Sequence, residues 1–431
     1  MKQRSLEELF DQCINKKLII KNKDMLRHSY TPDVLPHRGE QIENLVLPLI
    51  STLKGETPSN ILIYGKTGTG KTAVVKYVGK AIVKRVGGKF YSRPYINRIK
   101  PDLEVENNDN TPVYFIYINC EVVDTQYRML AKLCEYLGAS VPLTGWPTDK
   151  VYDTFFNALD SSKRLVIVVL DEIDKLLKKS SEDILYNLTR INTDLKNAKV
   201  SIIGISNDLN FIEFLDPRIK SSLGEEEIIF PPYDAVQLVD ILTQRASEAF
   251  YPDVIGSGVI QLCAAFAAQE HGDARRALDL LRVSAEIAER ENSKKIEERH
   301  VKEAKIRTEN DRIIEVLKTL PTQSKLVLYS VVLLEKYNTS TIITGDVYSV
   351  YKDLCRLSGQ DILTQRRTSD LISELDMLGI LNAKIINKGR YGRTKEIRLG
   401  VPINQIKIEL EADYKIERIS YYVPPVQHKL G

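Results

Sequence analysis

Apolar residues in the first half of the chain come in short runs that alternate with amphipathic stretches. Four runs rich in β-branched and aromatic residues predict buried strands at residues 59–64, 113–119, 165–170 and 200–205. Each run is followed by helical periodicity or by turn residues. Strands that alternate with helices in this way are typical of a parallel sheet between two layers of helices. The first half of the chain is therefore predicted to be a three-layer α/β domain.

From residue 231 the pattern becomes helical. The stretches DAVQLVDILTQRASEAF, GVIQLCAAFAAQEH and DARRALDLLRVSAEIAERE place apolar residues at i, i+3 and i+4. The charged stretch ENSKKIEERHVKEAKIRTENDR then predicts a solvated helix that leads into a third unit. Helical signals at 324–337, 345–358 and 366–378 precede two alternating segments around a basic tip, in LNAKIINKGRYGRTKEIRLG. Three helices and a basic hairpin predict a winged-helix domain.

These changes of pattern divide the chain into four segments. We expect the α/β domain over residues 1–230, the helical domain over 231–310 and the winged helix over 311–402. Residues 403–431 show no pattern that predicts a structure or a role. Residues 87–112, basic and aromatic first and acidic later, have the character of an inserted loop. That loop is either a disordered surface loop or a contact with nucleic acid or a partner.

The composition narrows the class of protein. The 431 residues are 43% hydrophobic and 28% charged, which is typical of a globular chain of two or three domains. The net charge is only +3, so an affinity for nucleic acid has to come from a local basic patch. The five cysteines are far apart, which argues against a zinc site or a disulfide framework. Without an apolar leader or an apolar run of 18 residues, we expect a cytoplasmic protein with no membrane span.

The sequence GKTGTGKT, between the first predicted strand and a helix, matches the phosphate-binding P-loop pattern. Its glycines let the backbone N–H groups point at phosphate oxygens, and the N-terminus of the following helix faces the same anion. Lys71 is expected to reach the β- and γ-phosphates, and the Thr72 hydroxyl to ligate Mg²⁺. The residues expected to bind nucleotide in this segment are Gly65, Lys66, Thr67, Gly68, Thr69, Gly70, Lys71, Thr72, Ala73, Val74 and Val75.

Acidic residues follow the third predicted strand, where LVIVVLDEID ends in Asp171 and Glu172. Ligands of open parallel sheets gather at the carboxyl ends of the strands, so these acids and the P-loop together predict Mg²⁺-dependent nucleotide hydrolysis. Asp171 is expected to hold the water shell of the metal, and Glu172 to polarise the attacking water. The next strand ends at Asn207, which can orient the same water, although alone it reads as a turn former.

The motifs GKTGTGKT, VVLDEID, IGISND, LDPRIKSSLGEEEIIFPPYDA and HGDARRALDLLR resemble, in this order, the AAA+ initiators of archaeal DNA replication. These are the archaeal relatives of the eukaryotic origin recognition complex and of its helicase-loading ATPase. The resemblance covers roughly residues 30–400. It implies a slow Mg²⁺-dependent ATPase that uses ATP and ADP mainly as a switch, with the helical domain as the AAA+ lid.

The resemblance also assigns roles to single residues. It makes Asn207 the sensor-1 residue and Arg275 the sensor-2 arginine, where a guanidinium suits γ-phosphate sensing and lid closure. Without it, Arg275 reads as surface charge on a helix. Arg218 stands where family members carry an arginine finger for a neighbouring subunit. The second arginine that eukaryotic relatives often carry four residues later is Ser222 here, so activation in trans is in doubt.

Further nucleotide contacts are implied outside the P-loop. The segment TPDVLPHRGEQIENL resembles the adenine-binding segment of the family. Two further residues, one at the lid entrance and one in the first helix of the lid, resemble additional contacts. Without the resemblance, the aromatic residue of that pair would be an anchoring side chain. The implied contacts are Leu35, Pro36, Arg38, Tyr233 and Arg245.

The basic patch lies in the predicted winged helix, where residues 381–400 hold six basic side chains and one acidic one. A helix-turn-helix places its recognition helix in the major groove, and a basic wing can enter the adjacent minor groove. A solvated hairpin or a protein-binding winged helix is the alternative. The candidates for DNA contact in this domain are Gln365, Arg366, Arg367, Thr368, Lys388, Arg390, Tyr391, Arg393 and Lys395.

Family members also insert a small DNA-contacting element in the AAA+ domain, after the second strand and its helix. The stretch SVPLTGWPTDKVYDTFF occupies that place, with Gly145 and Trp146 as candidates for DNA contact. Trp146 could equally cap the core.

We therefore expect an ATP-dependent initiator that binds double-stranded origin DNA in the nucleoid and helps recruit or load the replicative helicase. Helicase recruitment, and paralogous initiators as partners, rest on the resemblance alone. One alternative is a clamp-loader-like ATPase, which would carry a C-terminal helical collar in place of a basic winged helix. Another is a signal-transduction-type ATPase that acts as a DNA-binding transcription regulator. The origin sequence, the assembly state and the resting nucleotide stay open.

Overall fold

The computed structural model forms two compact units, Met1–Ala304 and Lys305–Gly431. The residues that it describes are 19–27, 30–32, 34–92, 101–106, 111–142, 144–179, 182–210, 213, 215–337, 341–387 and 393–425. None of the helices in this part of the chain is both long enough and apolar enough to cross a membrane.

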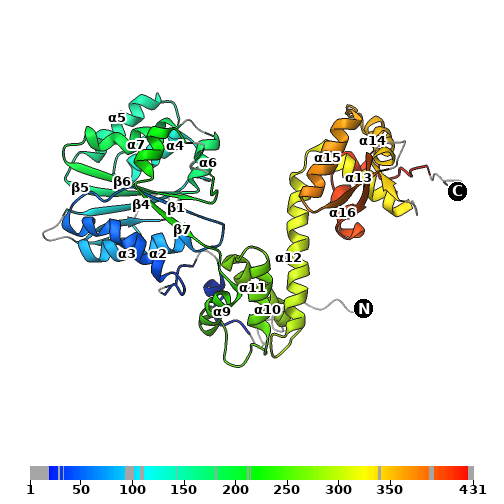
Figure 1. Cartoon of the computed structure of the whole chain (residues 1–431), viewed down its shortest axis with the longest axis horizontal. Coiled ribbons are helices and arrows are strands. Elements are labelled where there is room, and N and C mark those ends of the chain that lie inside the picture. Colours follow the sequence, from blue (N-terminus) through cyan, green and yellow to red (C-terminus); the bar gives the residue numbers. More distant parts are fainter. Residues whose placement is uncertain are drawn as a thin grey trace, which may run out of the picture. The chain divides into compact units, whose positions relative to one another are not determined.

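A seven-stranded sheet is the centre of the first unit (Figure 1). Its strands are β1 Ile61–Gly65, β2 Gly88–Tyr91, β3 Leu103–Val105, β4 Val113–Asn119, β5 Arg164–Asp171, β6 Ala198–Ser206 and β7 Glu226–Phe230. Their spatial order is β3-β2-β4-β5-β6-β1-β7, and every pair except β2 and β3 is parallel. The four strands expected from the sequence are all present, and the prediction of a parallel sheet is confirmed.

The expectation of a loop over residues 87–112 is wrong for its two ends. Strand β2 pairs in parallel with β4, and β3 pairs antiparallel with β2, so the segment extends the edge of the sheet. Phe90 is fully buried and stacks on Phe115, with ring centroids 5.3 Å apart. The two strands have only four and three residues, too few to produce a recognisable alternation among the surrounding charges. Residues 93–100 and 107–110 lie outside the described part of the chain.

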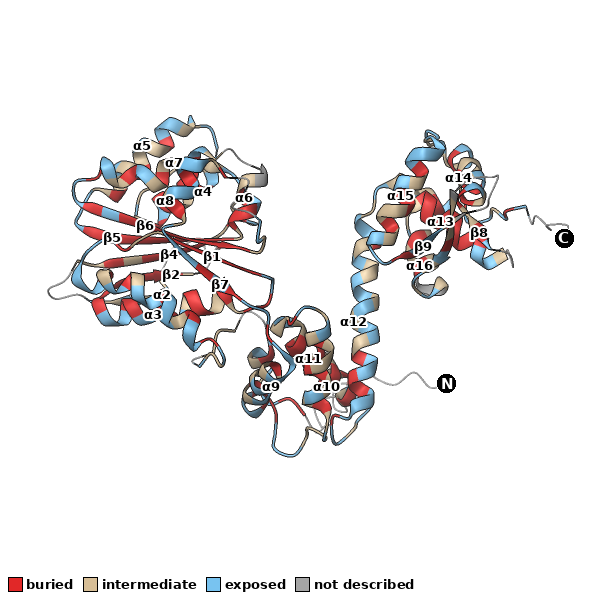
Figure 2. Cartoon of the chain, viewed as in Figure 1, coloured by how far each residue is buried: buried red, intermediate tan, exposed pale blue. Residues whose placement is uncertain are grey.

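Helices cover both faces of this sheet. On one face lie α2 Gly39–Leu49 and α3 Lys71–Val86 (Figure 1). The helices on the other face are α4 Gln126–Tyr136, α5 Thr148–Leu159, α6 Ile173–Lys179, α7 Asp183–Arg190 and α8 Pro217–Leu223. Side chains along each strand alternate between the two resulting cores: in β1, Leu62 belongs to one core, and Ile61 and Ile63 belong to the other. Figure 2 shows the buried sheet between helices with exposed outer faces, which confirms the three-layer prediction.

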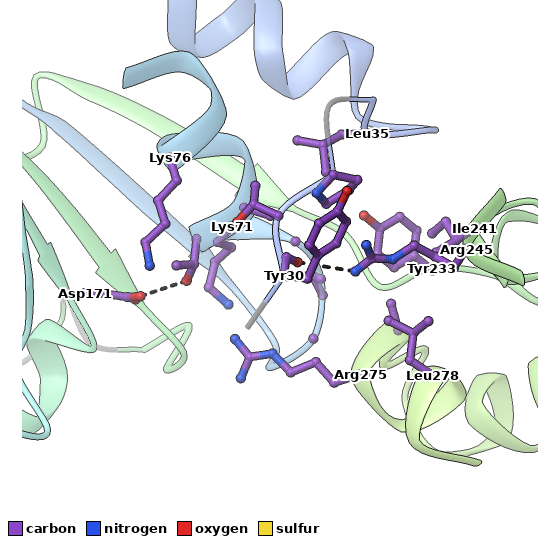
Figure 3. Close-up of a pocket in the computed structure, with 18 of the residues that line it drawn as sticks. Tyr30, Leu35, Lys71, Lys76, Asp171, Tyr233, Ile241, Arg245, Arg275 and Leu278 are labelled. Carbon is purple, nitrogen blue, oxygen red and sulfur yellow. Dashed lines mark hydrogen bonds between the residues drawn. The ribbon is translucent and has the colours of Figure 1, made fainter. Parts of the chain in front are cut away.

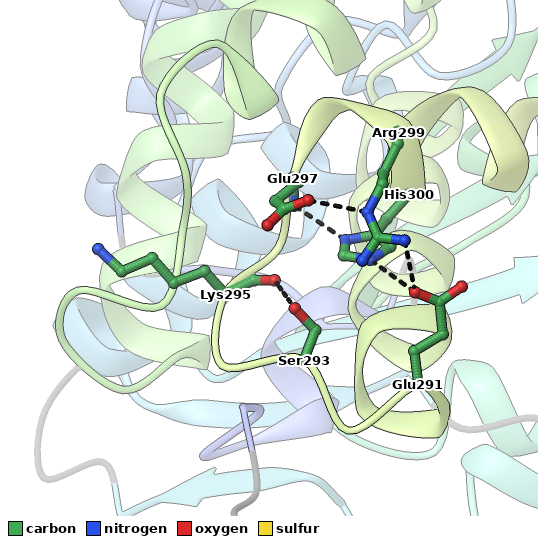
Figure 4. Close-up of polar contacts among 6 residues, drawn as sticks. All are labelled: Glu291, Ser293, Lys295, Glu297, Arg299 and His300. Atoms are coloured by element: carbon green, nitrogen blue, oxygen red, sulfur yellow. Dashed lines mark hydrogen bonds and ion pairs between the residues drawn. The ribbon is translucent and has the colours of Figure 1, made fainter.

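A helical bundle follows the sheet within the same unit. It consists of α9 Ala235–Ala249, α10 Val259–Gln269, α11 Ala274–Arg290 and the first turns of α12 Glu298–Thr319, around one apolar core. The start of α12 is tied down by polar contacts (Figure 4). The buried His300 accepts the backbone N–H of Glu297 at 2.9 Å through Nδ1, and its Nε2 lies 3.2 Å from Oε2 of Glu291. Oε2 of Glu291 also lies 3.0 Å from the guanidinium of Arg299. The first turn of α12 is thereby held to the bundle.

The second unit has the predicted order of three helices and a hairpin. The helices are α13 Thr322–Tyr337, α14 Thr344–Ser358 and α15 Gln365–Met377, and the strands are β8 Ile342–Ile343, β9 Leu381–Asn387 and β10 Arg393–Leu399. The three strands form an antiparallel sheet in the order β8-β10-β9. The prediction of a winged helix is confirmed.

Residues 403–425, for which the sequence predicted no structure, are part of this unit. They form α16 Ile403–Glu411 and α17 Tyr414–Glu417, whose Ile406, Leu410 and Ile416 are buried in the winged-helix core. Nζ of Lys325 in α13 lies 2.8 Å from Oδ2 of Asp413, the N-cap of α17. The C-terminal segment therefore contributes to the core of the domain.

Candidate functional site

A cavity of about 390 Å³ lies in the first unit, where the P-loop and the carboxyl ends of β4 and β5 face the helical bundle (Figure 3). Segments far apart in the sequence meet there: residues 30–32 and 35–36, residues 68–73 at the P-loop and the start of α3, the ends of three strands, and helices α9 and α11. This is the edge at which open parallel sheets bind ligands.

The P-loop has the backbone that phosphate binding requires. Gly68 and Gly70 have φ angles of +71° and +90°, which strain a residue with a side chain. A Cβ atom at Gly68 would also lie 1.7 Å from Oδ1 of Asp273, the N-cap of α11. Nζ of Lys71 donates to the carbonyl oxygens of Gly65 and Lys66, each at 2.7 Å. Burial of this ammonium lowers the pKa of Lys71 to about 8.

Two hydroxyl groups meet on the carboxylate of Asp171. Oγ1 of Thr72 donates to its Oδ2 at 2.7 Å, and the phenol of Tyr117 donates to the same oxygen at 2.6 Å. Oδ1 of Asp171 accepts the backbone N–H of Glu172 at 3.0 Å. Burial, reinforced by the Asp171 charge, raises the pKa of Tyr117, so the phenol is the donor in this contact.

Glu172 lines the cavity and has a left-handed backbone, at φ +56°. Partial burial raises the pKa of Glu172, and the neighbouring carboxylates of Glu121 and Asp171 raise it further. A carboxylate with a raised pKa is a better proton acceptor near neutral pH. Asn207, directly after β6, lines the same cavity.

Arg275 brings a second cation to the site. It is the second residue of α11, and its backbone N–H is capped by Asp273 at 2.7 Å. Figure 3 shows its side chain extending toward the P-loop near Lys71. The Arg275 charge also contributes to the lowered pKa of Lys71. Two converging cations and a helix N-terminus favour an anion at this end of the cavity.

The opposite end of the cavity is more apolar. Leu35, Pro36, Tyr233, Ile241 and Leu278 line it. Arg245, only 5% exposed, places its guanidinium 4.5 Å from the ring centroid of Tyr30 and donates through Nη2 to the Tyr30 carbonyl at 3.3 Å. Nη1 of Arg245 is buried without a hydrogen-bond partner among the residues that the structure describes. A flat, apolar ligand would fit the apolar lining at this end, and an acceptor atom on it could take a hydrogen bond from Nη1 of Arg245.

Arg38 lies behind the P-loop and does not line the cavity. It is 2% exposed, and it donates through Nε to the Thr69 carbonyl at 2.9 Å and through Nη2 to the Pro231 carbonyl at 2.7 Å. Its guanidinium lies 3.8 Å from the ring centroid of Tyr233. Arg38 therefore ties the P-loop to the segment that enters the helical bundle.

Other residues expected at the site have different surroundings. The side chains of Val74 and Val75 are fully buried in the core, so only their backbone can face a ligand. Lys66 and Thr67 line an adjoining cavity of about 550 Å³ together with Asn207. The exposed Arg218 is not part of either lining, and its Nη2 lies 3.0 Å from Oδ2 of Asp216.

The sequence patterns missed several residues of the cavity. Tyr117 and Lys76 lie beside Asp171, and Nζ of Lys76 lies 3.9 Å from the ring centroid of Tyr117. The sequence contains only an indirect signal for them, because it predicted both strands but not that they are neighbours. In the structure β4 pairs with β5, Asn119 lies opposite Asp171, and the end of β4 therefore lies beside the acids. The missed residues are Tyr30, Thr31, Pro32, Lys76, Tyr117, Asn119, Glu121, Ile241, Gln244, Ala274 and Leu278.

In the second unit, a hollow of about 480 Å³ lies between the start of α15 and the hairpin. Gln365 and Arg366 are exposed and line it, whereas Arg367 points its Nη1 to Oε1 of Glu374 at 3.2 Å. Thr368 does not suit a DNA contact, because it is fully buried and donates to the Thr364 carbonyl at 3.2 Å.

The hairpin differs from expectation at Lys395. Its ammonium donates to the Ser369 carbonyl at 3.1 Å and to Oγ of Ser373, which ties β10 to α15. Lys388, Arg390 and Tyr391 lie outside the described residues, and of Arg393 only the backbone is described.

Trp146 packs partly buried against the core of the first unit. Nζ of Lys150 lies 4.0 Å from its ring centroid. Gly145 has a φ of +101°, and a Cβ atom added there would have no atom of the described residues outside its chain neighbours within 4 Å. These contacts favour the core-capping interpretation of Trp146, while the region around Gly145 stays accessible.

Three family models match the chain in sequence order: an AAA ATPase domain over residues 34–203, a Cdc6 AAA+ ATPase-type lid domain over 239–306, and a CDC6 C-terminal winged helix domain over 315–408. Two relatives are similar along nearly all of their length. The ORC1-type DNA replication protein 1 of Methanosarcina mazei is 56% identical over 432 residues, which cover 100% of this chain and 99% of the relative. The ORC1-type DNA replication protein of Pyrococcus furiosus is 58% identical over 419 residues, 96% of this chain and 95% of the relative.

A solved structure is also similar: the Aeropyrum pernix ORC1 protein in complex with DNA. It superposes with a TM-score of 0.76 at 43% identity, over 93% of this chain and 99% of that one.

Proposed function

The chain belongs to the ORC1-type DNA replication proteins, a family of AAA+ ATPases that initiate replication, and we propose that it binds double-stranded origin DNA in an ATP-dependent manner and helps recruit or load the replicative helicase. The observation that carries the nucleotide part is the cavity in which the P-loop meets Asp171, Glu172 and Arg275. Helicase recruitment rests on the resemblance to helicase-loading ATPases.

In this proposal the cavity binds ATP or ADP along its length. The P-loop amides, Lys71 and Arg275 hold the phosphates at the cationic end. The adenine lies at the apolar end, against Leu35 and near Tyr233, where Nη1 of Arg245 can donate to a ring nitrogen. Arg38 acts indirectly, by fixing the P-loop carbonyl of Thr69.

The oxygen donors beside the P-loop fit Mg²⁺. The Thr72 hydroxyl and the Asp171 carboxylate are hard ligands, and Mg²⁺ in nucleotide sites keeps several waters and takes other ligands from the phosphates. Among the described residues, no group of three His, Cys, Asp or Glu side chains could hold a metal alone, which agrees with this mode of binding. When bound, Mg²⁺ would neutralise charge on the phosphate chain.

Hydrolysis requires a water in line with the γ-phosphate. We assign Glu172 as the group that takes the water's proton, with Asn207 orienting the water and Arg275 stabilising the charge. The water oxygen bonds to the γ-phosphorus, the bond to the β–γ bridging oxygen breaks, and ADP and phosphate leave. Because Arg218 pairs with Asp216 outside the cavity lining, it does not supply an arginine finger to this cavity, and we expect slow turnover.

The second unit supplies the DNA contacts in this proposal. Gln365 and Arg366, exposed at the start of α15, are placed as the first residues of a recognition helix in a major groove, with the hairpin at the adjacent minor groove. A winged helix in this position does not support the clamp-loader alternative, which predicted a helical collar.

The proposal is tested by two measurements on the purified chain. Acid extraction should release bound adenine nucleotide, and fluorescence anisotropy should show tighter binding to an origin fragment from the same genome than to random duplex of equal length. Nucleotide-free protein without measurable ATP affinity would contradict the nucleotide part. Equal affinity for both duplexes at every salt concentration would contradict the origin-binding part.

A further inference from the structure

Tyr117 is a buried polar group that none of the nucleotide motifs includes. It lies near the end of β4, is 8% exposed and lines the nucleotide cavity. Its hydroxyl donates to Oδ2 of Asp171 at 2.6 Å, a distance typical of a hydrogen bond from a hydroxyl to a charged acceptor. A carboxylate only accepts, so the direction of this hydrogen bond is fixed.

The contacts of Asp171 leave little of its carboxylate unused. An ionised carboxylate has about four acceptor positions, two on each oxygen. On Oδ2 both are taken, by Thr72 at 2.7 Å and by Tyr117. On Oδ1 the backbone N–H of Glu172 takes one, at 3.0 Å. Among the residues that the structure describes, one acceptor position on Oδ1 is therefore left for a further donor.

The ring of Tyr117 is held in place from two sides. Its backbone pairs with Val169 in β5, two residues before Asp171, which fixes its distance from the carboxylate. Nζ of Lys76 lies 3.9 Å from the centroid of its ring. Lys76 comes from α3, four residues after Thr72, so one helix supplies both a donor to Asp171 and the cation against the ring. A cation at this distance is attracted to the ring face and restrains it.

We propose that Tyr117 is a positioning residue for the magnesium site: its hydroxyl locks the Asp171 carboxylate so that a single Oδ1 position faces the water shell of the metal. This inference rests on the proposed function as a Mg²⁺-dependent ATPase. A hydrogen bond from Thr72 alone would hold only Oδ2 of Asp171 and would let the carboxylate rotate about that hydrogen bond. Tyr117 adds a second point on the same oxygen, and the Glu172 N–H adds a third on the other.

The test is Tyr117→Phe, which removes only the hydroxyl. The matched control is Tyr114→Phe, on the same strand but packed against the core on the opposite face of the sheet. A fluorescent ADP analogue is titrated into nucleotide-free full-length protein, first in EDTA and then across Mg²⁺ concentrations. We expect Tyr117→Phe to need about ten-fold more Mg²⁺ for the half-maximal gain in affinity, with its affinity in EDTA unchanged. Tyr114→Phe should match the wild type in both conditions.

Two results would overturn the inference. An unchanged Mg²⁺ midpoint would show that the hydroxyl does not act on the metal site. An equal loss of affinity in EDTA and in Mg²⁺ would show that Tyr117 shapes the nucleotide pocket itself. A double variant provides a second check, because Tyr117→Phe should have no further effect once Asp171→Asn is present. Failure of the proposed function is distinct from all of these, since the wild type would then bind no nucleotide.

Discussion

Lys71 and Glu172 lie in the same cavity but have different tasks, which single substitutions can separate. Lys71→Ala removes a charge-assisted contact to phosphate, so we expect nucleotide affinity to fall by about ten- to a hundred-fold. Glu172→Gln keeps the shape of the side chain but removes the proton acceptor. Its nucleotide affinity should stay near that of the wild type, while hydrolysis falls by about a hundred-fold or more.

The measurement pairs equilibrium binding of a fluorescent ATP analogue with phosphate release under single-turnover conditions. If both variants lose affinity to the same extent, Glu172 contributes to binding, and its assignment as the proton acceptor is wrong. If Lys71→Ala binds normally, the phosphates do not lie at the P-loop.

Residues at fixed spacing were predictable from the sequence, whereas residues brought together by pairing were not. Lys71 and Thr72 follow from the P-loop pattern, and Asp171 follows from its place after an apolar run. Tyr117 reaches Asp171 only because β4 and β5 pair in one register, and Lys76 reaches Tyr117 only because α3 lies over that strand. Such contacts depend on the order of strands in the sheet. The spacing of residues within one motif does not determine that order.

At the scale of elements, Lys395 joins the hairpin to α15. The second unit therefore has basic residues that are held inside the domain and basic residues that are exposed and can contact DNA. The Lys395 ammonium is already bound to Ser369 and Ser373, whereas Arg366 is exposed. We expect Arg366→Ala to lower the slope of log affinity against log salt by about one unit, because a phosphate or base contact is lost. Lys395→Met should leave the slope unchanged and instead reduce the preference for origin over random duplex.

Anisotropy titrations over a series of salt concentrations, with both duplexes, provide the measurement. A reduced slope for Lys395→Met would show that its ammonium leaves α15 to contact phosphate. An unchanged slope for Arg366→Ala would remove the start of α15 from the interface.

The C-terminal helices give a prediction about stability. The hydrogen bond from Lys325 lowers the pKa of Asp413, a carboxylate that is charged in the folded unit. A lowered folded-state pKa contributes stability above the unfolded value, near 4, and this stability is lost as the pH falls through the folded value. Asp413→Asn should therefore destabilise the second unit by about 1 kcal/mol at pH 7. The difference should shrink below about pH 4.

Urea unfolding of the full chain, with hydrogen exchange measured on peptides from residues 322–425, reports on this unit separately. Asparagine can still cap α17, so the variant isolates the ion pair. Glu409→Gln is the control, because its carboxylate lies 3.9 Å from Lys318, whose side chain is 63% exposed. A loss that is independent of pH, or equal in the control, would contradict the role of the Lys325–Asp413 pair.

Long elements with strong periodicity were predictable, and short ones were not. The sequence predicted the helices around α13, α14 and α15 and the hairpin strands. α13 is a long apolar run, α14 and α15 have an apolar stripe, and the two strands alternate. It missed β2 and β3, which depend on pairing at the sheet edge. It also missed α16 and α17, whose few buried residues are interleaved with charges and need α13 to cover them.

At the scale of the whole molecule, the order of motifs predicted the family and the AAA+ fold, and three helices with a basic hairpin predicted the winged helix. The comparisons confirm all three. The order of motifs is more informative than any one motif, because a P-loop alone occurs in many classes of ATPase. The assignment of Arg218 remains a prediction, since an arginine finger acts on a neighbouring molecule.

At this scale we predict how ATP hydrolysis depends on contact between copies of the chain. Arg218 pairs with Asp216, and Ser222 stands where a second arginine is often found in eukaryotic relatives, so activation between copies should be weak. We expect ATP turnover per molecule, measured without DNA, to change little as the protein concentration rises. A steep increase that is abolished by Arg218→Ala would show that the residue acts in trans after all.

The central claim is that this chain acts at replication origins. It is tested most directly by mapping its binding across the genome of its own cells, with chromatin immunoprecipitation and sequencing, alongside a map of newly replicated DNA. We expect the strongest binding at the sites where replication begins, and reduced binding there for Arg366→Ala. Binding that is concentrated at promoters away from those sites would contradict the claim and favour a transcription regulator.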